Sequence, residues 1–412
     1  MHNAISDIRD AVVEGVAAGH VKAIVVRGEG RAFCAGADIS QQGSAAPVER
    51  RVQQPLDPGN PAARNFEDLS VPVVAAIHGF ALGGGLELAL GCHYRILAAD
   101  ARVGLPEVNI GILPGGQGTQ RLPRLVGIDS ALEIITTGRH LPADEALSFG
   151  VVDEVVPPGD DAGAAVFAAA MAMASDLVGI EPAELDRRKI SRMPPPDADR
   201  AVLDKWMAHV QEARFGEPAP INIVKSVEAS CTSDSFAAGV AQEGKNMQPL
   251  MGSPEAFALR HLFFSERAYL RGGDSAAPVE SLIEAIAVQD SGGPSSVAVP
   301  VGATESEVEG LLFPVVNDAL ALLAANPAAS TDDIDVAYTQ AYGFPRYLVS
   351  RLHSPLRQED FLPVLPADRN VCCAGRADVV GGAVGPAARE GGPGGRGRRR
   401  DRSPCRGRGE PR

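Results

Sequence analysis

Three consecutive glycines stand between a buried strand-like run and a helix-competent segment, and this arrangement restricts the fold more than any other feature. Residues 71–77 are almost entirely Val, Ala and Ile, as in a buried strand. Gly83-Gly84-Gly85 come soon after, and Glu87 lies in the apolar run 86–90. Glycine has no Cβ, so a ligand can approach its backbone closely, and the first N–H groups of a helix have no partner within it. The layout predicts free N–H groups that face a ligand and can hold a developing oxyanion.

Two further segments extend this candidate site. Residues 30–39 are rich in Gly and Ala and follow a strand-like run at 21–26, so a second loop can present a backbone N–H to the same oxygen. Residues 104–116 carry Glu107 in an otherwise apolar and glycine-rich setting. Burial beside apolar walls raises a carboxyl pKa toward neutrality, where proton transfer works best. Glu87 and Glu107 are therefore candidates for paired acid–base chemistry.

These segments resemble the motifs of the crotonase (enoyl-CoA hydratase/isomerase) superfamily in order and spacing. The matching stretches are residues 31–39, 79–87 and 105–122, and the resemblance extends over residues 3–270. The run 251–267 is similar to the segment that joins the hydratase to a dehydrogenase in the multifunctional fatty-acid β-oxidation enzyme. The chain therefore looks most similar to the hydratase part of that enzyme.

The resemblance implies an α/β fold, a crotonase-type ββα superhelix followed by helical segments, and the low-complexity Gly/Arg end of the chain predicts a disordered tail. Alternating strand-like and helix-like runs in the first part of the chain favour the same class. Crotonase-like chains usually have one or two strands before an Asn-Ala pair like Asn3-Ala4, so a shortened start is expected. The expected parts are a hydratase/isomerase core at 1–190, a helical extension at 191–270, a linker at 271–303, a helical segment at 304–349 similar to part of the C-terminal domain of 3-hydroxyacyl-CoA dehydrogenases, and a disordered tail at 350–412.

The function that the resemblance implies is hydration of trans-2-enoyl-CoA in fatty-acid β-oxidation, a lyase reaction. Glu87 would activate water for attack at C3, and Glu107 would deliver a proton to C2. The backbone N–H groups of Ala37 and Gly84 would hold the thioester oxygen. The residues expected to contact the coenzyme A thioester are Arg31, Ala35, Gly36, Asp38, Ile39, Gly83 and Gly115.

Two alternatives remain open. A Δ3–Δ2 enoyl-CoA isomerase moves a proton with one carboxylate, and this is expected as a side activity of the same site. A catalytically inactive scaffold from a truncated multifunctional enzyme, which binds acyl-CoA or oligomerises, would explain the short start and the missing dehydrogenase domain. Against the scaffold stand both glutamates and the glycine loops, all of which are intact.

No cofactor is expected, because the coenzyme A thioester is the substrate. The interval from Arg267 to Glu305 is too short for a dinucleotide-binding domain. The GxGxxG match at 392–397 lies in an Arg-rich tail with no strand-like run before it. NAD binding and 3-hydroxyacyl-CoA dehydrogenase activity are therefore expected to be absent.

The amino-acid composition of the chain disfavours several classes of binding partner. A net charge of −14, one Trp and five Tyr disfavour nucleic-acid binding. The six cysteines show neither CxxC pairs nor zinc spacing, so no metal is expected and a reducing cytoplasm fits best. No apolar run is long enough to span a membrane. The expected partner is acyl-CoA, with a homo-oligomer or a thiolase complex left open. His78 and His93 are expected to be packing residues.

Overall fold

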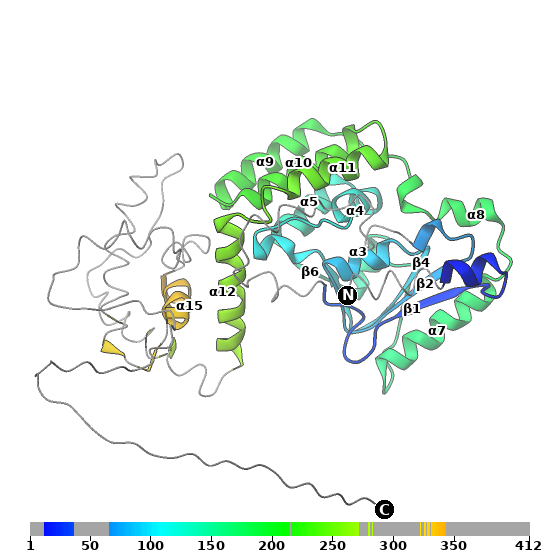
Figure 1. The fold of residues 1–412 in the computed structure, drawn as a ribbon, viewed down its shortest axis with the longest axis horizontal. Helices are drawn as coiled ribbons and strands as arrows, with labels where there is room; N and C mark the ends of the chain where they lie inside the picture. The colour runs from blue at the N-terminus through cyan, green and yellow to red at the C-terminus, as the bar shows by residue number, and fades with distance from the viewer. Residues whose placement is uncertain are drawn as a thin grey trace, which may run out of the picture. The chain divides into compact units, whose positions relative to one another are not determined.

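The described part of the computed structural model leaves out several segments of the chain (Figure 1). The described residues are 12–36, 66–214, 216–271, 279, 280, 282, 322, 325, 326, 328, 329 and 331–342. The expected disordered tail at 350–412 and most of the expected linker at 271–303 lie outside them. The expected domain boundaries therefore stay predictions.

Strands of the described residues form two sheets. A parallel four-stranded sheet has the order β1-β2-β4-β7, and a three-stranded sheet has the order β3-β5-β6, in which β5 and β6 are antiparallel. The strands are β1 (Ile24–Arg27), β2 (Val73–Ile77), β3 (Phe80–Leu82), β4 (Tyr94–Ala98), β5 (Arg102–Gly104), β6 (His140–Pro142) and β7 (Glu154–Val156).

The central strand β2 is the strand expected at 71–77. All five of its residues are buried, as is usual where a parallel sheet is covered on both faces. Its register places Val73 beside Ile24 of β1 and Val74 beside Tyr94 of β4. Helix α7 (Ala162–Asp176) packs against the strands of this sheet. The first candidate loop follows β1 of this sheet, whereas the glycine turn follows β3 and the segment with Glu107 follows β5, both in the three-stranded sheet.

Helices surround the sheets and continue the chain after them. The short helices are η3 (Phe66–Asp68), α3 (Gly84–Leu90), η4 (Pro106–Ile110), α6 (Ala143–Ser148), α8 (Pro182–Arg187) and η5 (Ile190–Arg192). The longer ones are α4 (Gly118–Val126), α5 (Ile128–Thr137), α7, α9 (Arg200–Ala213), α10 (Pro218–Thr232), α11 (Phe236–Met247), α12 (Pro254–Leu270) and α15 (Thr331–Tyr342). Helix α15 falls within the segment expected to be helical at 304–349.

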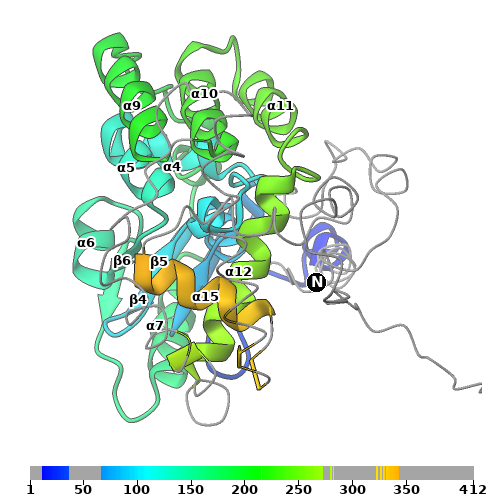
Figure 2. The ribbon, with the colours of Figure 1, turned by 90° about the vertical axis from the view of Figure 1, so that its left-hand side faces the viewer.

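Local sequence explains where the later helices begin. The side chains of Asp199, Ser235 and Ser253 accept hydrogen bonds from the first-turn N–H groups of α9, α11 and α12. Helices α9, α10 and α11 lie over α4 and α5 (Figures 1 and 2), and α10 packs against each of the other four.

Helix α12 packs against η4, the short helix that carries Glu107. The approach is close, because a Cβ atom on Gly111 would lie 2.5 Å from Ala256 Cα. Gly111 also has a φ of +74°, which favours glycine. The segment that the sequence likens to a hydratase–dehydrogenase junction therefore supports the candidate site directly.

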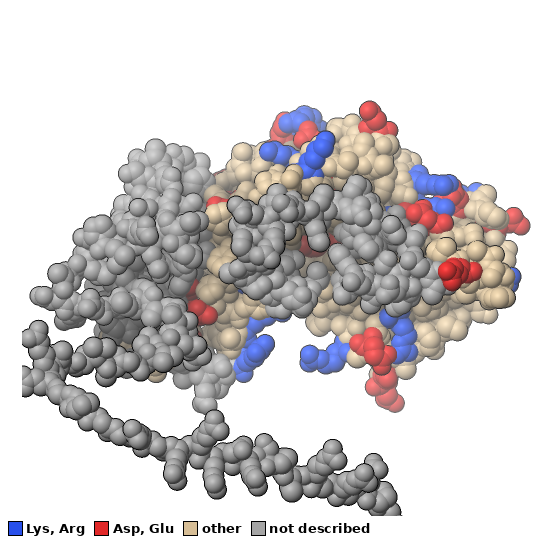
Figure 3. Space-filling view, viewed as in Figure 1, with Lys and Arg blue, Asp and Glu red and all other residues tan. Residues whose placement is uncertain are grey.

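On the face in Figure 3, side chains of both charges are scattered among other residues, and neither charge forms one large patch on the described part of this face. Among the described helices, none is long and apolar enough to cross a membrane.

Candidate active site

The two glycine-bearing loops lie side by side, as the sequence predicts. The Cys34 N–H donates to the Phe80 carbonyl oxygen at 3.0 Å, and the Leu82 N–H donates to the Cys34 carbonyl oxygen at 2.9 Å. A Cβ atom on Gly85 would lie 2.1 Å from Cys34 O, so only glycine fits there. The sequence did not reveal β3, the short strand that precedes the glycine turn and pairs through these bonds with residues 33–34.

Gly36 brings the first loop to the start of α3. Its φ is +100°, and a Cβ atom on it would lie 3.9 Å from the Gly84 backbone nitrogen. Gly84 is the first residue of α3, so its N–H has no partner within the helix. Ala37, the expected second oxyanion donor, lies outside the described residues, as do Asp38 and Ile39. The chain therefore enters Ala37 from a point beside the Gly84 N–H.

Glu87 is held by a turn from another part of the chain. It lies in the first turn of α3 and is 5% exposed. Its Oε1 atom accepts hydrogen bonds from the N–H groups of Gly116 at 2.7 Å and Gly118 at 2.8 Å. Burial raises the pKa of Glu87, these two bonds and the charge of Arg121 oppose the rise, and the pKa is about 7. The carboxyl is therefore fixed in place and able to exchange a proton near neutral pH.

Glu107, which lies in η4, approaches the Gly83–Gly84 turn. A Cβ atom on Gly83 would lie 3.0 Å from Glu107 Oε1, and one on Gly84 would lie 3.9 Å from Glu87 Oε2. The Glu107 Oε2 atom is buried and has no hydrogen-bond partner among the described residues. Burial, followed by the charge of Glu87, raises the pKa of Glu107 well above its ordinary value. Both carboxyls therefore flank the Gly83–Gly84 turn, and both are easier to protonate than an exposed glutamate.

For the other described residues expected to contact substrate, the structure shows their position but no contact that would indicate a role. Arg31 and Ala35 are exposed on the first loop. A Cβ atom on Gly115 would lie 2.9 Å from Met247 Cε, and Gly115 precedes the Gly116 N–H that holds Glu87. Their roles in substrate binding stay predictions.

Both histidines near the site are packing residues, as expected. The His78 Nε2 atom lies 2.9 Å from the Gly30 carbonyl oxygen. The Val73 N–H donates to His93 Nδ1 at 3.2 Å, and His93 Nε2 lies 3.1 Å from the Glu67 carbonyl oxygen. Burial lowers the pKa of His93 to about 4, so this side chain is neutral at physiological pH.

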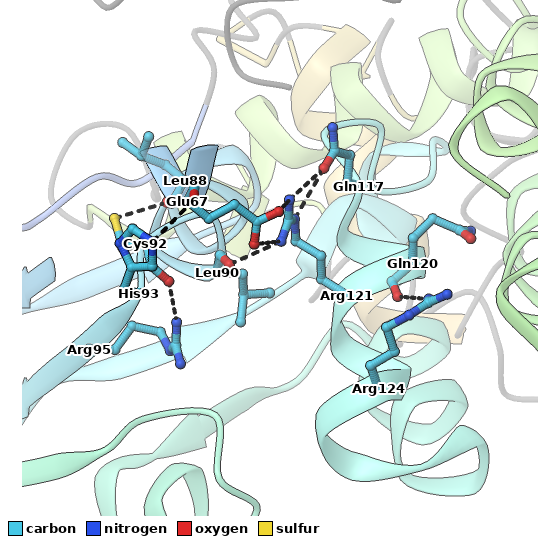
Figure 4. Close-up of polar contacts among 10 residues, drawn as sticks. All are labelled: Glu67, Leu88, Leu90, Cys92, His93, Arg95, Gln117, Gln120, Arg121 and Arg124. Atoms are coloured by element: carbon cyan, nitrogen blue, oxygen red, sulfur yellow. Dashed lines mark hydrogen bonds and ion pairs between the residues drawn. The ribbon is translucent and has the colours of Figure 1, made fainter. Parts of the chain in front are cut away.

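A buried ion pair beneath the site was missed by the sequence reading. Arg121 donates to both carboxylate oxygens of Glu67, at 2.8 Å and 2.9 Å, and also to Gln117 Oε1 (Figure 4). Burial raises the pKa of Glu67, but the hydrogen bonds and charge of Arg121, together with hydrogen bonds from Ser191, outweigh it and the pKa is lowered. The pair joins η3 to α4 and anchors the side chain of Gln117 in the turn that holds Glu87.

The described residues contain no cluster of three or more His, Cys, Asp or Glu side chains arranged to hold a metal ion. Another buried carboxyl, Glu243 of α11, was also missed, and it accepts hydrogen bonds from the Gln117 and Thr119 N–H groups of the turn that holds Glu87. No local motif marks it, because it comes more than a hundred residues after the turn.

Known proteins match a part of this chain. The family model for enoyl-CoA hydratase/isomerase matches residues 3–185. The peroxisomal bifunctional enzyme of Cavia porcellus is 39% identical over 274 residues, which are 64% of this chain and 36% of that protein. The fatty acid oxidation complex subunit alpha of Shewanella loihica is 38% identical over 62% of this chain and 35% of its own length. A crystal structure of carnitinyl-CoA hydratase from Mycobacterium avium is 27% identical and covers 62% of this chain and 83% of its own, with a TM-score of 0.42.

Residues 3–185 therefore form a domain of the enoyl-CoA hydratase/isomerase (crotonase) type. The expected α/β crotonase-type fold is thereby confirmed. The chain spans about a third of the length of the curated relatives it matches. Because some of these relatives are named as peroxisomal and others are bacterial, the cytoplasmic location stays a prediction.

Proposed function

We propose that this chain hydrates trans-2-enoyl-CoA thioesters as a step of fatty-acid β-oxidation. The observation that carries the proposal is the pair of buried carboxyls, Glu87 and Glu107, on either side of the Gly83–Gly84 turn. The match of residues 3–185 to the family model and the names of the relatives support the same chemistry. Hydration changes no oxidation state overall, so the reaction needs no redox cofactor.

The two carboxyls start the proposed reaction in different protonation states. Glu87, whose pKa of about 7 leaves an ionised fraction at neutral pH, takes a proton from water in its ionised form while the water oxygen bonds to C3. The electrons of the double bond move toward the thioester carbonyl, whose oxygen gains negative charge. The N–H of Gly84, together with that of Ala37, stabilises this oxygen. Glu107 then gives its proton to C2, and a proton passed from Glu87 to Glu107 restores the starting state.

The two roles predict a bell-shaped pH dependence of kcat/KM. Glu87 must be ionised, so we expect kcat/KM to rise with pH through an apparent pKa of about 7. Glu107 must be protonated, so kcat/KM should fall again as the pH rises through the raised pKa of Glu107. Initial rates with crotonyl-CoA across the pH range test this. A profile already flat from pH 5 upward would contradict the role of Glu87 as the base.

The proposal is tested by purifying the chain and following the loss of the crotonyl-CoA enone absorbance. Turnover is expected. A folded protein that binds crotonyl-CoA without turnover would instead support the inactive scaffold. The absence of NAD-dependent oxidation is tested separately with 3-hydroxybutyryl-CoA and NAD.

An isomerase side activity also belongs to this proposal. The Glu107 Oε2 atom has no partner among the described residues, whereas Glu87 is engaged by two N–H groups. A single carboxyl with a free oxygen suffices to move a proton between C2 and C4. Glu107 is therefore the group assigned to this reaction.

A further inference from the structure

Glu243 of α11 contacts the turn that holds Glu87. Its carboxylate accepts three hydrogen bonds from the turn, from the Gln117 N–H at 2.8 Å, the Thr119 N–H at 3.2 Å and the Thr119 hydroxyl at 2.5 Å. Glu243 is 1% exposed. A buried carboxyl is costly unless its hydrogen bonds are made, so these bonds account for its presence in the core.

Successive N–H groups of the turn alternate between two carboxyls. Gly116 and Gly118 donate to Glu87, while residues 117 and 119 donate to Glu243. The bonds to Glu87 and the bonds to Glu243 require the same backbone conformation, because their donors are neighbouring peptide units. If Glu243 is lost, the turn is therefore held less firmly in the conformation that binds Glu87.

The turn contains a strained residue that these contacts stabilise. Gln117 has a φ of +80°, in the left-handed region that residues other than glycine seldom adopt. Its N–H is held by Glu243, and its side-chain oxygen is held by Arg121, as Figure 4 shows for the latter. Conformations of this kind persist only where the surroundings over-determine them.

Glu243 can accept all three bonds of the turn only when its carboxyl is ionised. The Gln120 side-chain amide donates to the Thr119 hydroxyl oxygen at 2.9 Å, and the Thr119 hydroxyl in turn contacts the Glu243 carboxyl. Burial and the charge of Glu87 raise the pKa of Glu243 to about 8 although the three bonds oppose the rise, so ionisation of Glu243 is complete only above that pH.

We infer that Glu243 is a positioning residue, which acts through the 116–119 turn to fix the carboxyl of Glu87 for catalysis. This inference rests on the proposed hydratase function for its kinetic consequences. Its structural consequence, a turn ordered by Glu243, does not depend on that function.

The test compares Glu243→Gln with Asn246→Ala in the full chain. Gln keeps the size of Glu243 but turns an NH2 group toward an N–H or hydroxyl donor of the turn. Asn246 is the matched control, because it is a buried polar residue one turn further along α11 that bonds Ser226 Oγ and not the turn. We expect Glu243→Gln to lower kcat for crotonyl-CoA by about 10- to 100-fold with little change in KM. We expect Asn246→Ala to lower the melting temperature and leave kcat unchanged.

A double variant separates action through Glu87 from a general loss of structure. If Glu243 acts through Glu87, adding Glu243→Gln to Glu87→Gln lowers the residual rate little further. If each substitution lowers kcat in the double variant by the same factor as it does alone, the inference is overturned. An unchanged kcat in Glu243→Gln would overturn it as well.

Hydrogen–deuterium exchange of the peptide that spans residues 114–122 gives a readout independent of activity. We expect faster exchange in folded Glu243→Gln than in the wild type, and no such local change in Asn246→Ala. Equal exchange in Glu243→Gln and wild type overturns the inference, whatever the kinetics. If the wild-type chain shows no hydratase activity, the proposed function fails, and the exchange result still decides whether Glu243 orders the turn.

A milder variant keeps the test decisive if Glu243→Gln does not fold. Thr119→Val removes one donor to Glu243 and retains a β-branched side chain of similar size. It should increase exchange in the same peptide and lower kcat by a smaller factor than Glu243→Gln would. No change in either quantity would count against the inference.

Discussion

Glu87→Gln and Glu107→Gln are each expected to lower kcat for crotonyl-CoA hydration by about 10²- to 10⁴-fold, the range usual for loss of general acid–base catalysis. Gln at position 87 still offers its side-chain oxygen to Gly116 and Gly118, whose N–H groups now hold Glu87 Oε1. The variant should therefore fold and bind substrate, and the loss should appear in kcat rather than in KM. Steady-state rates with crotonyl-CoA measure both quantities.

A carboxyl away from the site provides the control. Glu133 of α5 is partly exposed and pairs with Arg139 at 2.7 Å. Because Glu133→Gln removes a surface ion pair of small energetic value, it should leave kcat unchanged. If Glu87→Gln and Glu107→Gln both hydrate crotonyl-CoA as fast as this control, the assignment of the two glutamates is wrong.

The same variants separate hydration from isomerisation. Moving a proton between C2 and C4 of a 3-enoyl-CoA needs Glu107 alone in the proposed site, so Glu87→Gln should retain most of that activity. Glu107→Gln should lose both reactions. Equal losses of isomerisation in the two variants would show that Glu87 also takes part in the proton shift.

The sequence predicted what is encoded locally. A continuous run of Val, Ala and Ile predicted β2, because burial of the strand on both faces requires apolar side chains at every position. Gly83 and Gly84 predicted a backbone that a ligand can approach, which stays a prediction, and the structure places the carboxyls of Glu107 and Glu87 beside these glycines. These features follow from the chemistry of neighbouring residues, so a short stretch of sequence is sufficient to show them.

Contacts between distant segments could not be predicted in that way. Glu243 and Gln117 are 126 residues apart, and Glu67 and Arg121 are 54 apart. In the sequence each is an ordinary charged or polar residue, whose usual place is the surface. Only the tertiary fold shows that these side chains are buried and paired. The left-handed conformation of Gln117 was hidden for the same reason, since distant partners stabilise it.

Arg121→Met is expected to lower the free energy of unfolding by about 3–5 kcal/mol, the usual cost of removing one partner of a buried ion pair. The side chains of Arg121 and Glu67 are 1% and 0% exposed. Without Arg121, the Glu67 carboxylate is left in the core without its ion-pair partner, and Gln117 loses its side-chain donor. Urea denaturation followed by far-UV circular dichroism measures the change. Arg200→Met, which removes a side chain that is 69% exposed, is the control and should leave the free energy of unfolding nearly unchanged.

The pH dependence of the difference in unfolding free energy between Arg121→Met and the wild type shows whether the charge of Arg121 or its packing stabilises the fold. In the wild type the pKa of Glu67 is below its ordinary value of 4.5, so the pair stabilises the fold above that pH and this contribution is lost as the pH falls through the lowered pKa. In Arg121→Met the carboxyl keeps its burial and its Ser191 hydrogen bonds but loses the hydrogen bonds and charge of Arg121, so the pKa of Glu67 is higher than in the wild type. The variant therefore takes up a proton at a higher pH than the wild type, and a protonated Glu67 costs less to bury. The difference in unfolding free energy between the two proteins should then narrow as the pH is lowered from 7 toward 4. A difference that stays constant over this range would mean that Arg121 stabilises the fold by packing rather than by its charge.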